Sequence, residues 1–321
     1  MFHGFRRYPQ TVLKNIPLIG TAIAALYERC DRGGWLSDLI ADPQRIWEGR
    51  VAKASKGGVF DARSQPLVSV VVATRNNERT IGQALQSLLK QTLSQIEIVV
   101  VDDASTDRSV EIVTELMRAD KRLRLLVNEN RLGTGLSRNI GMMASRGDFI
   151  TFQDGDDASE PNRLALQHQA FQKFPSKHVV TCNYVRVDEF GNSLRVNEKR
   201  TMKCIISMMF RRQDVLSKIG YFRDGTISED ADYYERIKVA FGPGCDVTVF
   251  RTLYKALFRP NSSFFGGARI TEKSDSLVLF KRDAEVVAHW KTLTDEHKMM
   301  RSGEKSPFVP HIVRGNTREI S

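Results

Sequence analysis

Three carboxylates follow an apolar stretch of the chain. In FITFQDGDD, residues 149–157, the acids are Asp154, Asp156 and Asp157, and no lysine or arginine lies among them. Carboxylate oxygens are the ligands that Mg²⁺ and Mn²⁺ prefer, and a bound cation would relieve the repulsion between like charges. Because Gly155 permits a tight turn, Asp154 and Asp156 can point into one pocket. The cluster predicts a divalent-cation site in which the cation is the missing positive charge.

Two further polar clusters also follow apolar stretches of strand length. ATRNNE, at residues 73–78, follows the run Val68–Ala73, and DDASTD, at residues 102–107, follows the run Ile96–Asp102. Parallel strands of an α/β sheet end at one edge, and ligands bind beyond that edge. The sequence therefore predicts that these clusters and the three carboxylates line one pocket.

The elements that must position these clusters alternate between strands and helices. Between the apolar runs, apolar residues recur at the three- and four-residue spacing of one helical face, as in Ile81, Ala84, Leu85, Leu88 and Leu89. Strands that are apolar on both faces and alternate with amphipathic helices predict an α/β fold with a mostly parallel sheet flanked by helices. The first four strands are predicted at Val68–Ala73, Ile96–Asp102, Leu123–Val127 and Phe149–Gln153.

The pattern is looser after residue 179. Further strands are expected at Val179–Val187 and Ile205–Phe210, and helices at Arg212–Gly220 and Ser228–Ile237. The C-terminal region is predicted to form a helix over Thr271–Lys298, followed by a partly disordered tail from Met299. Residues 1–65 are predicted to be a basic, helical N-terminal extension that ends in a linker.

Composition narrows the class of protein. The 321 residues carry a net charge of +10, with 41% hydrophobic and 27% charged residues, which indicates a folded chain with either an acidic or phosphate-bearing partner or a solvated basic surface. The four cysteines form no CxxC pair, so neither a zinc site nor a disulfide framework is expected. The longest apolar stretch, Ile16–Leu26, is shorter than the ~20 residues that span a bilayer. We expect a cytoplasmic protein without a nucleic-acid partner, whose basic flanks leave open a peripheral contact with the inner face of the plasma membrane.

Several ordered motifs resemble those of family 2 glycosyltransferases with the GT-A fold. They are PLVSVVVATRNNERTIGQALQSLLKQTLSQIEIVVVDDASTDRS at residues 66–109, LGTGLSRNIGMMASRGDFITFQDGDD at 132–157 and ISEDADYYERI at 227–237. The resemblance covers about Pro66 to Ser263. It implies a Rossmann-like GT-A domain at residues 66–265, with a nucleotide-binding half at 66–160 and an acceptor half at 161–265, followed by the C-terminal helix and tail at 266–321.

The resemblance also implies roles for residues that would bind a nucleotide-sugar donor. Asp154-Gly155-Asp156 matches the DxD motif, which implies that Asp154 and Asp156 hold Mn²⁺ or Mg²⁺ on the donor diphosphate. Asp157 follows as an acid that would touch the sugar, a role as plausible as capping the next helix. Asp103 resembles the residue that reads the base, with Asp102 beside it, and Arg138 would face the nucleotide. The residues of the loop that would cradle the nucleoside are Ala73, Thr74, Arg75, Asn76 and Glu78.

Glu229-Asp230 resembles the acid pair of the acceptor site. An inverting transfer needs a base near the acceptor hydroxyl, so Asp230 is predicted to be the base and Glu229 to orient the acceptor. An acidic first turn of a helix, favoured by the helix dipole, is the structural alternative. The resemblance thus implies a metal-dependent inverting transfer from a sugar nucleotide, UDP-sugars foremost, to a glycan or lipid-linked acceptor in surface polysaccharide synthesis.

Other classes of protein remain as alternatives or are excluded. A sugar-nucleotide-binding protein without transferase activity and a GT-A-like nucleotidyltransferase remain. A dinucleotide-binding dehydrogenase is excluded, because GTGLSR at residues 133–138 has Arg138 where the third glycine of that fingerprint is required.

Overall fold

The computed structural model describes residues 66–225, 228–259, 262, 265, 267–311 and 315–320, all within the unit Phe60–Ser321. The predictions made for residues 1–65 lie outside the described residues. Within the described part of the chain, no helix combines the length and the apolar character that crossing a membrane would demand.

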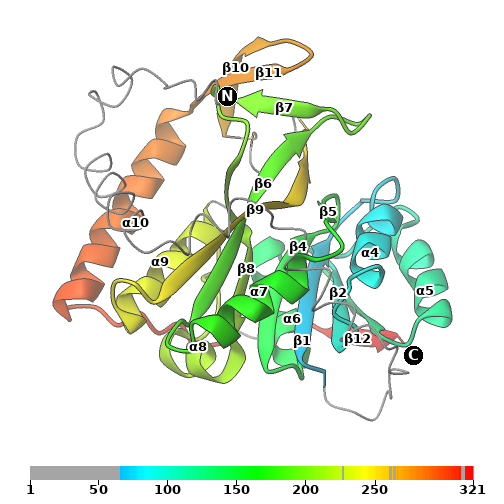
Figure 1. Cartoon of the computed structure of the whole chain (residues 1–321), viewed down its shortest axis with the longest axis horizontal. Helices are drawn as coiled ribbons and strands as arrows, with labels where there is room; N and C mark the ends of the chain where they lie inside the picture. Colours follow the sequence, from blue (N-terminus) through cyan, green and yellow to red (C-terminus); the bar gives the residue numbers. More distant parts are fainter. Residues whose placement is uncertain are drawn as a thin grey trace, which may run out of the picture. The chain divides into compact units, whose positions relative to one another are not determined.

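The first half of this unit is a parallel sheet. Strands β1 (Val68–Thr74), β2 (Ile96–Asp102), β3 (Leu123–Asn128) and β4 (Phe149–Asp154) lie in the order β3-β2-β1-β4. All of their mutual pairings are parallel. The predicted strands are confirmed, three of them longer by one residue at the carboxyl end. The predicted α/β architecture is confirmed as well (Figure 1).

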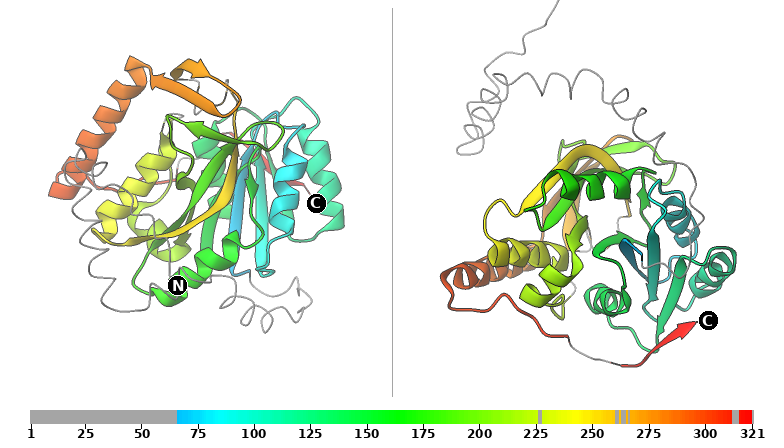
Figure 2. Two further views of the ribbon diagram at one scale, coloured as in Figure 1. Left: turned by 45° about the horizontal axis from the view of Figure 1, so that its top comes forward. Right: turned by 60° about the horizontal axis from the view of Figure 1, so that its bottom comes forward.

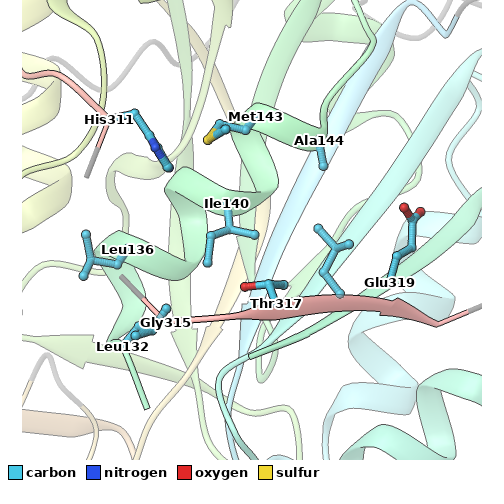
Figure 3. Close-up of a pocket in the computed structure, with 10 residues that line it drawn as sticks. Leu132, Leu136, Ile140, Met143, Ala144, His311, Gly315, Thr317 and Glu319 are labelled. Atoms are coloured by element: carbon cyan, nitrogen blue, oxygen red, sulfur yellow. The ribbon is translucent and has the colours of Figure 1, made fainter. Parts of the chain in front are cut away.

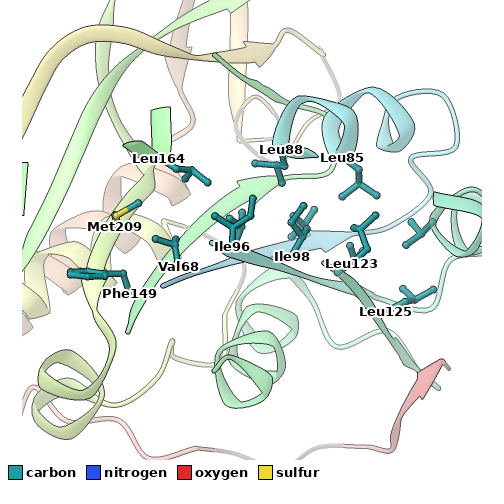
Figure 4. Close-up of a cluster of buried hydrophobic side chains, with 14 of the residues drawn as sticks. Val68, Leu85, Leu88, Ile96, Ile98, Leu123, Leu125, Phe149, Leu164 and Met209 are labelled. Carbon is teal, nitrogen blue, oxygen red and sulfur yellow. The ribbon is translucent and has the colours of Figure 1, made fainter. Parts of the chain in front are cut away.

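Alternating side chains of the strands contact helices on opposite faces of the sheet. On one face, Val70 and Ile98 belong to a buried cluster with residues of α4 (Ile81–Leu89), α5 (Ser109–Ala119) and α7 (Arg163–Lys173). Figure 4 shows Ile98 in this cluster with Leu85 and Leu88 of α4 and Leu164 of α7. On the other face, Val71 and Val101 face α6 (Thr134–Ala144). This period-two division explains why the strands read as continuous apolar runs.

The second half extends the sheet with antiparallel pairs. Strand β8 (Met202–Arg211) pairs with β4, and β6 (Val179–Val187) pairs with β8, while the long β9 (Asp246–Leu257) runs parallel to β6. Helices α8 (Arg212–Ile219) and α9 (Glu229–Phe241) pack on the same face as α6. A two-residue strand, β5 (Ala158–Ser159), pairs with β9 directly after the carboxylate cluster.

The C-terminal region corrects two predictions. The helix expected over Thr271–Lys298 is wrong in its first part, where β10 (Ala268–Lys273) and β11 (Leu277–Arg282) form a hairpin that continues the sheet through β7 (Ser193–Val196). The helix itself, α10, spans Ala284–Ser302. The tail is also more ordered than expected, because β12 (Thr317–Ile320) pairs antiparallel with β3 at the edge of the sheet (Figure 2).

Helix α6 lies unusually close to the sheet. A Cβ atom at Gly141 would overlap Cγ1 of Val71 and stand 3.2 Å from Cγ2 of Val101. Because β1 and β2 lie in the middle of the sheet, neither valine can retreat without disturbing its own packing. A glycine at this position is therefore what allows the close approach of α6.

We predict that Gly141→Ala destabilises the protein by about 1–3 kcal/mol through overpacking. Gly82→Ala is the matched control in α4, where a Cβ would meet Cγ2 of Ile112 at an ordinary 3.5 Å. That change should be neutral or should stabilise by up to about 1 kcal/mol, since alanine favours a helix more than glycine does. Urea unfolding of both variants measures the difference, and equal effects would contradict the prediction.

Candidate active site

The strand register brings the predicted clusters together at one edge of the sheet. Thr74 at the end of β1 pairs with Asp102 at the end of β2. On the other side of β1, Ala73 pairs with Asp154 at the end of β4. The expectation that the three polar clusters share one edge is therefore met by the backbone pairing.

The loops after β1 and β2 are fastened to each other. The backbone N–H of Asn76 donates to Ser105 Oγ at 2.9 Å, and the Asn76 side-chain oxygen accepts from the N–H of Thr106 at 2.8 Å. Glu78 accepts from the N–H of Arg108 at 3.1 Å, at the start of α5. Arg75 donates to the carbonyl of Asp103 at 3.3 Å. In the structure, Arg75, Asn76 and Glu78, which were predicted to cradle the nucleoside, thus join the two loops to each other.

The paired acids after β2 have different surroundings. Asp103 accepts three hydrogen bonds, from the N–H groups of Leu132 (2.7 Å) and Gly133 (2.8 Å) and from Asn128 Nδ2 (3.1 Å), so it holds the loop before α6. Asp102 accepts from the N–H of Ser105 through Oδ1, and among the described residues its buried Oδ2 has no hydrogen-bond partner. Burial raises the pKa of Asp102. Of the two acids, only Asp102 therefore keeps a side-chain oxygen without a hydrogen-bond partner among the described residues.

The turn between Asp154 and Asp156 is held against the end of β1. A Cβ at Gly155 would lie 2.5 Å from Thr74 Oγ1 and 3.0 Å from Asn77 Nδ2, so a side chain there would push the turn away. Thr80 Oγ1 donates to the Gly155 carbonyl at 3.2 Å. Glycine is required here for close packing, and this packing fixes where the neighbouring carboxylates point.

Asp154, Asp156 and Asp157 can converge on one cation. Each offers an oxygen, and these oxygens lie within 4.8 Å of one another. Burial, followed by the charges of the neighbouring acids, raises the pKa of Asp156 and, more strongly, that of Asp157. A donor set made of carboxylate oxygens fits Mg²⁺ or Mn²⁺. Asp157 does not cap α7, which begins at Arg163; instead its Oδ1 accepts from the N–H of Leu257 at 2.9 Å.

Two arginines from distant parts of the chain supply positive charge to this cluster. Arg138 on α6 bonds to Asp154 Oδ1 at 2.7 Å, and Arg259, just after β9, pairs with Asp156. Arg259 also donates to Asn77 Oδ1 at 3.1 Å, across 182 residues of sequence. Protein groups therefore provide part of the positive charge, beside the cation that the sequence predicts.

Glu229 and Asp230 begin α9 and face the same arginine. Arg138 Nη1 pairs with Asp230 and lies 3.5 Å from Glu229 Oε1. Burial and the charge of Asp230 raise the pKa of Glu229 to about 7. Burial likewise raises the pKa of Asp230, although Arg138 opposes the shift. Both acids thus share Arg138 with Asp154 of the carboxylate cluster, the proximity that their predicted roles require.

The rest of α9 is anchored away from the pocket. Asp232 accepts from Arg236 at 2.9 Å and contacts His297 of α10 at 2.8 Å. Arg236 is fully buried and donates to the carbonyls of Ile219, Tyr221 and Pro307. Burial alone would raise the pKa of Asp232, but its hydrogen bond with His297 and the charge of Arg236 hold it below its usual value. These contacts make the helix start a fixed support for Glu229 and Asp230.

A separate cavity of about 480 Å³ lies between α6 and the C-terminal tail (Figure 3). Its α6 wall is apolar and is made of Leu136, Ile140 and Met143, which lie on the opposite face of the helix from Arg138. None of the carboxylates discussed above lines it. We therefore assign the candidate active site to the edge of the sheet rather than to this cavity.

Comparison with known proteins agrees with this geometry. The family model described as "Glycosyl transferase family 2" matches residues 69–230. The glycosyltransferase GlyG of Streptococcus pneumoniae is 38% identical over 123 residues, which cover 38% of this chain and 40% of the relative. The putative glycosyltransferase EpsH of Bacillus subtilis is 44% identical over 119 residues, or 37% of this chain and 34% of EpsH. The chain thus spans well under two thirds of the length of these curated relatives.

Solved structures share the fold. Staphylococcus aureus TarS (residues 1–349) in complex with UDP-GlcNAc has a TM-score of 0.54 and 21% identity, covering 74% of this chain and 71% of that one. The complex of the same TarS segment with UDP has a TM-score of 0.50 and 24% identity, covering 62% of each chain. At these identities the likeness establishes the GT-A fold of the domain and not its ligand.

Sequence reasoning missed several residues of the site. Asn77 and Ser105 were not singled out, although Ser105 accepts from the N–H of Asn76 and Asn77 accepts from Arg259. Asn139 was given no role either, yet its amide bonds to the backbone of Phe222. No local sequence signal could have found these contacts, because each joins residues that are far apart in the chain.

We predict that Arg259→Gln raises the affinity for Mn²⁺ in the absence of nucleotide by about fivefold, since a partly exposed charge pair contributes roughly 1 kcal/mol. The reason is that a guanidinium and a cation compete for Asp156. Calorimetric titration with Mn²⁺ measures the change. Arg251→Gln, an exposed arginine of β9, is the matched control and should leave the affinity unaltered. Weaker or unchanged Mn²⁺ binding in Arg259→Gln would show that the two do not compete.

Proposed function

The chain belongs to glycosyl transferase family 2, and from that membership we propose that it is a metal-dependent, inverting glycosyltransferase that acts on a nucleotide-sugar donor. The observation that carries the proposal is the convergence of two acidic groups. The acids that can bind a cation, on β4, and the acids that begin α9 contact the same buried arginine, Arg138. A transfer between two substrates requires a donor site and a base in this proximity.

The donor is proposed to bind across the ends of β1, β2 and β4. The loop residues from Ala73 to Glu78 would enclose the nucleoside, and Asp103 with the unpartnered oxygen of Asp102 would read the base. Asp154 and Asp156 would hold Mn²⁺ or Mg²⁺, and Asp157 either joins them or contacts the sugar. When bound, the cation offsets charge on the departing diphosphate. Arg259, which follows β9 and pairs with Asp156, is proposed to contact the diphosphate together with Ser262, whose N–H bonds to the Arg259 carbonyl; Ser263 lies outside the described residues.

The acceptor is proposed to bind beside the start of α9. Asp230 would take the proton of the acceptor hydroxyl as its oxygen forms a bond to the anomeric carbon, while the bond from that carbon to the diphosphate breaks. Glu229 would orient the acceptor. A pKa near 7 suits Glu229 to share a hydrogen bond with a hydroxyl in either protonation state. Attack from the side opposite the leaving group inverts the anomeric configuration.

The substrates are proposed at the level of class. UDP-sugars are the first donors to test, since TarS, which shares the fold, was crystallised with UDP and UDP-GlcNAc. The acceptor is proposed to be a glycan or lipid-linked hydroxyl used in surface polysaccharide synthesis, and a net charge of +10 suits an anionic acceptor or peripheral contact with a cytoplasmic membrane face. Release of UDP or GDP from a donor panel, with and without Mn²⁺, tests the proposal and separates a transferase from a protein that only binds.

We predict that Asp156→Asn abolishes Mn²⁺-dependent binding of UDP, lowering the affinity at least about tenfold, because an amide is a weaker ligand than a carboxylate for a hard cation. Calorimetry with UDP and Mn²⁺ is the measurement. Asp275→Asn, in the exposed turn between β10 and β11, serves as a control for loss of a negative charge. If Asp156→Asn bound UDP and Mn²⁺ as tightly as the parent, the cation site would be assigned wrongly.

We predict that Asp230→Asn retains UDP and Mn²⁺ binding while the rate of transfer falls about 10²- to 10⁴-fold, the usual contribution of a general base. Glu235→Gln is the matched control on the same helix; its carboxylate pairs with Lys238 and Arg301 instead of the site. Steady-state transfer with the best donor of the panel compares the variants. Unchanged turnover in Asp230→Asn would remove it from the role of base.

A further inference from the structure

The positive charge of Arg138 is buried and shielded from water. Its side chain is 2% exposed and lies over the rings of Phe152 and Phe222, with the guanidinium carbon 5.5 and 5.7 Å from the ring centres. Burial alone would lower the pKa of Arg138, but the charges of Asp230, Asp154 and Glu229 raise it. A buried guanidinium is stable only while its partners stay in place, so these contacts fix their relative positions.

The guanidinium of Arg138 donates hydrogen bonds to acids of two different elements, β4 and α9. Nη2 donates to Asp154 at the end of β4, and Nη1 pairs with Asp230 and Glu229 at the start of α9. The remaining nitrogen, Nε, is buried and has no hydrogen-bond partner among the described residues. With so little of its surface accessible, Arg138 is poorly placed to contact a nucleotide directly, which is the role its resemblance implied.

Asn139, the residue after Arg138, links α6 to the backbone of Phe222, in the segment that precedes α9. Asn139 donates through Nδ2 to the carbonyl of Phe222 at 2.9 Å and accepts at Oδ1 from the Phe222 N–H at 2.8 Å. One turn earlier, a Cβ at Gly135 would stand 3.3 Å from the carbonyl oxygen of Arg223. Helix α6 therefore contacts the backbone of Phe222 and Arg223, which precede Glu229 and Asp230 in the chain, at more than one point.

We propose that Arg138 and Asn139 are positioning residues, through which α6 sets the distance between the cation-binding carboxylate Asp154 and the base Asp230. This inference rests on the proposed function. Because α6 packs closely on the sheet at Gly141, it holds Asp154, on the donor side, at a fixed distance from Asp230, on the acceptor side. Displacement of the base by even about 1 Å lowers the rate of an oriented reaction steeply.

The proposal has a specific kinetic consequence. A donor whose leaving group departs can react with the acceptor hydroxyl or with water, and in the second case the water oxygen bonds to the anomeric carbon and its proton goes to solvent. Transfer needs the base beside the one bound acceptor hydroxyl, whereas solvent water can attack from other positions and give its proton to solvent, so transfer depends more strongly on where Asp230 stands relative to the donor. The ratio of transfer to donor hydrolysis therefore reports the position of the base, and it does not depend on how much of the enzyme is folded.

The test uses Arg138→Lys in the full chain. An ammonium keeps the charge but cannot bond to both acids in the fork geometry of a guanidinium. We expect the ratio of transfer to hydrolysis to fall about tenfold to a hundredfold, while the affinity for UDP and Mn²⁺ stays within about threefold of the parent. Asn139→Ala, which removes both side-chain hydrogen bonds to the Phe222 backbone without adding a charge, should shift the ratio in the same direction by less, and it serves if Arg138→Lys does not fold.

Arg163→Lys is the matched control. Arg163 is also a fully buried arginine, but it donates to Thr151 Oγ1 and the carbonyl of Phe152. Its replacement should cost stability and leave the ratio unchanged. If Arg138→Lys instead lowered nucleotide affinity and reduced both reactions equally, Arg138 would be a nucleotide contact and the proposal would be wrong.

A second measurement separates failure of this inference from failure of the proposed function. If the parent releases no nucleotide from any donor, the transferase proposal fails. The link between Arg138 and Asp230 is then tested by comparing the unfolding free energies of Arg138→Lys, Asp230→Asn and the double variant. Residues that hold each other give non-additive effects. Strict additivity would overturn the link between Arg138 and Asp230, whatever the enzyme's activity.

Discussion

The contact of Arg138 with acids from β4 and α9 is the interaction on which the rest of the site depends. Without the guanidinium of Arg138 between them, the carboxylates of Asp154 and Asp230 would repel each other, and nothing would fix the distance between them. With it, the two groups become one unit whose dimensions follow from the position of α6. Much of the surrounding architecture serves that position: Gly141 brings the helix close to the sheet, Asn139 secures the adjoining segment, and Arg236 holds α9 from behind.

The fold of the nucleotide-binding half could be predicted because its signals are local. The continuous apolar runs of β1, β2, β3 and β4 follow from burial on two faces, and the helical spacing between them is equally direct. The C-terminal region could not be predicted in the same way. Residues 277–282 carry a short apolar run that suits a strand or a helix, and only the pairing of β11 with β7 and β10 decides between them. The strand β12 likewise exists through its partner β3.

The site divides along the same line. The carboxylates of QDGDD and the acids of Glu229-Asp230 could be named from the sequence, since residue type and spacing carry their chemistry. Their counter-ions could not, because Arg138 and Arg259 reach the cluster from α6 and from the end of β9. Asp157 is an example of what the sequence alone could not predict. The N–H of Leu257, at the end of β9, fixes its orientation, and the residues next to Asp157 in the sequence do not indicate that bond.

The pairing of β12 with β3 has a consequence for handling the protein. A parallel sheet that ended at β3 would present a row of unpaired N–H and C=O groups, which is a template for association with strands of other molecules. Residues 317–320 cover that row, and Glu319 adds an ion pair with Arg124 at 2.8 Å. The last strand thus protects the domain against aggregation, and a shortened chain that omitted it would expose a sticky edge far from any residue concerned with catalysis.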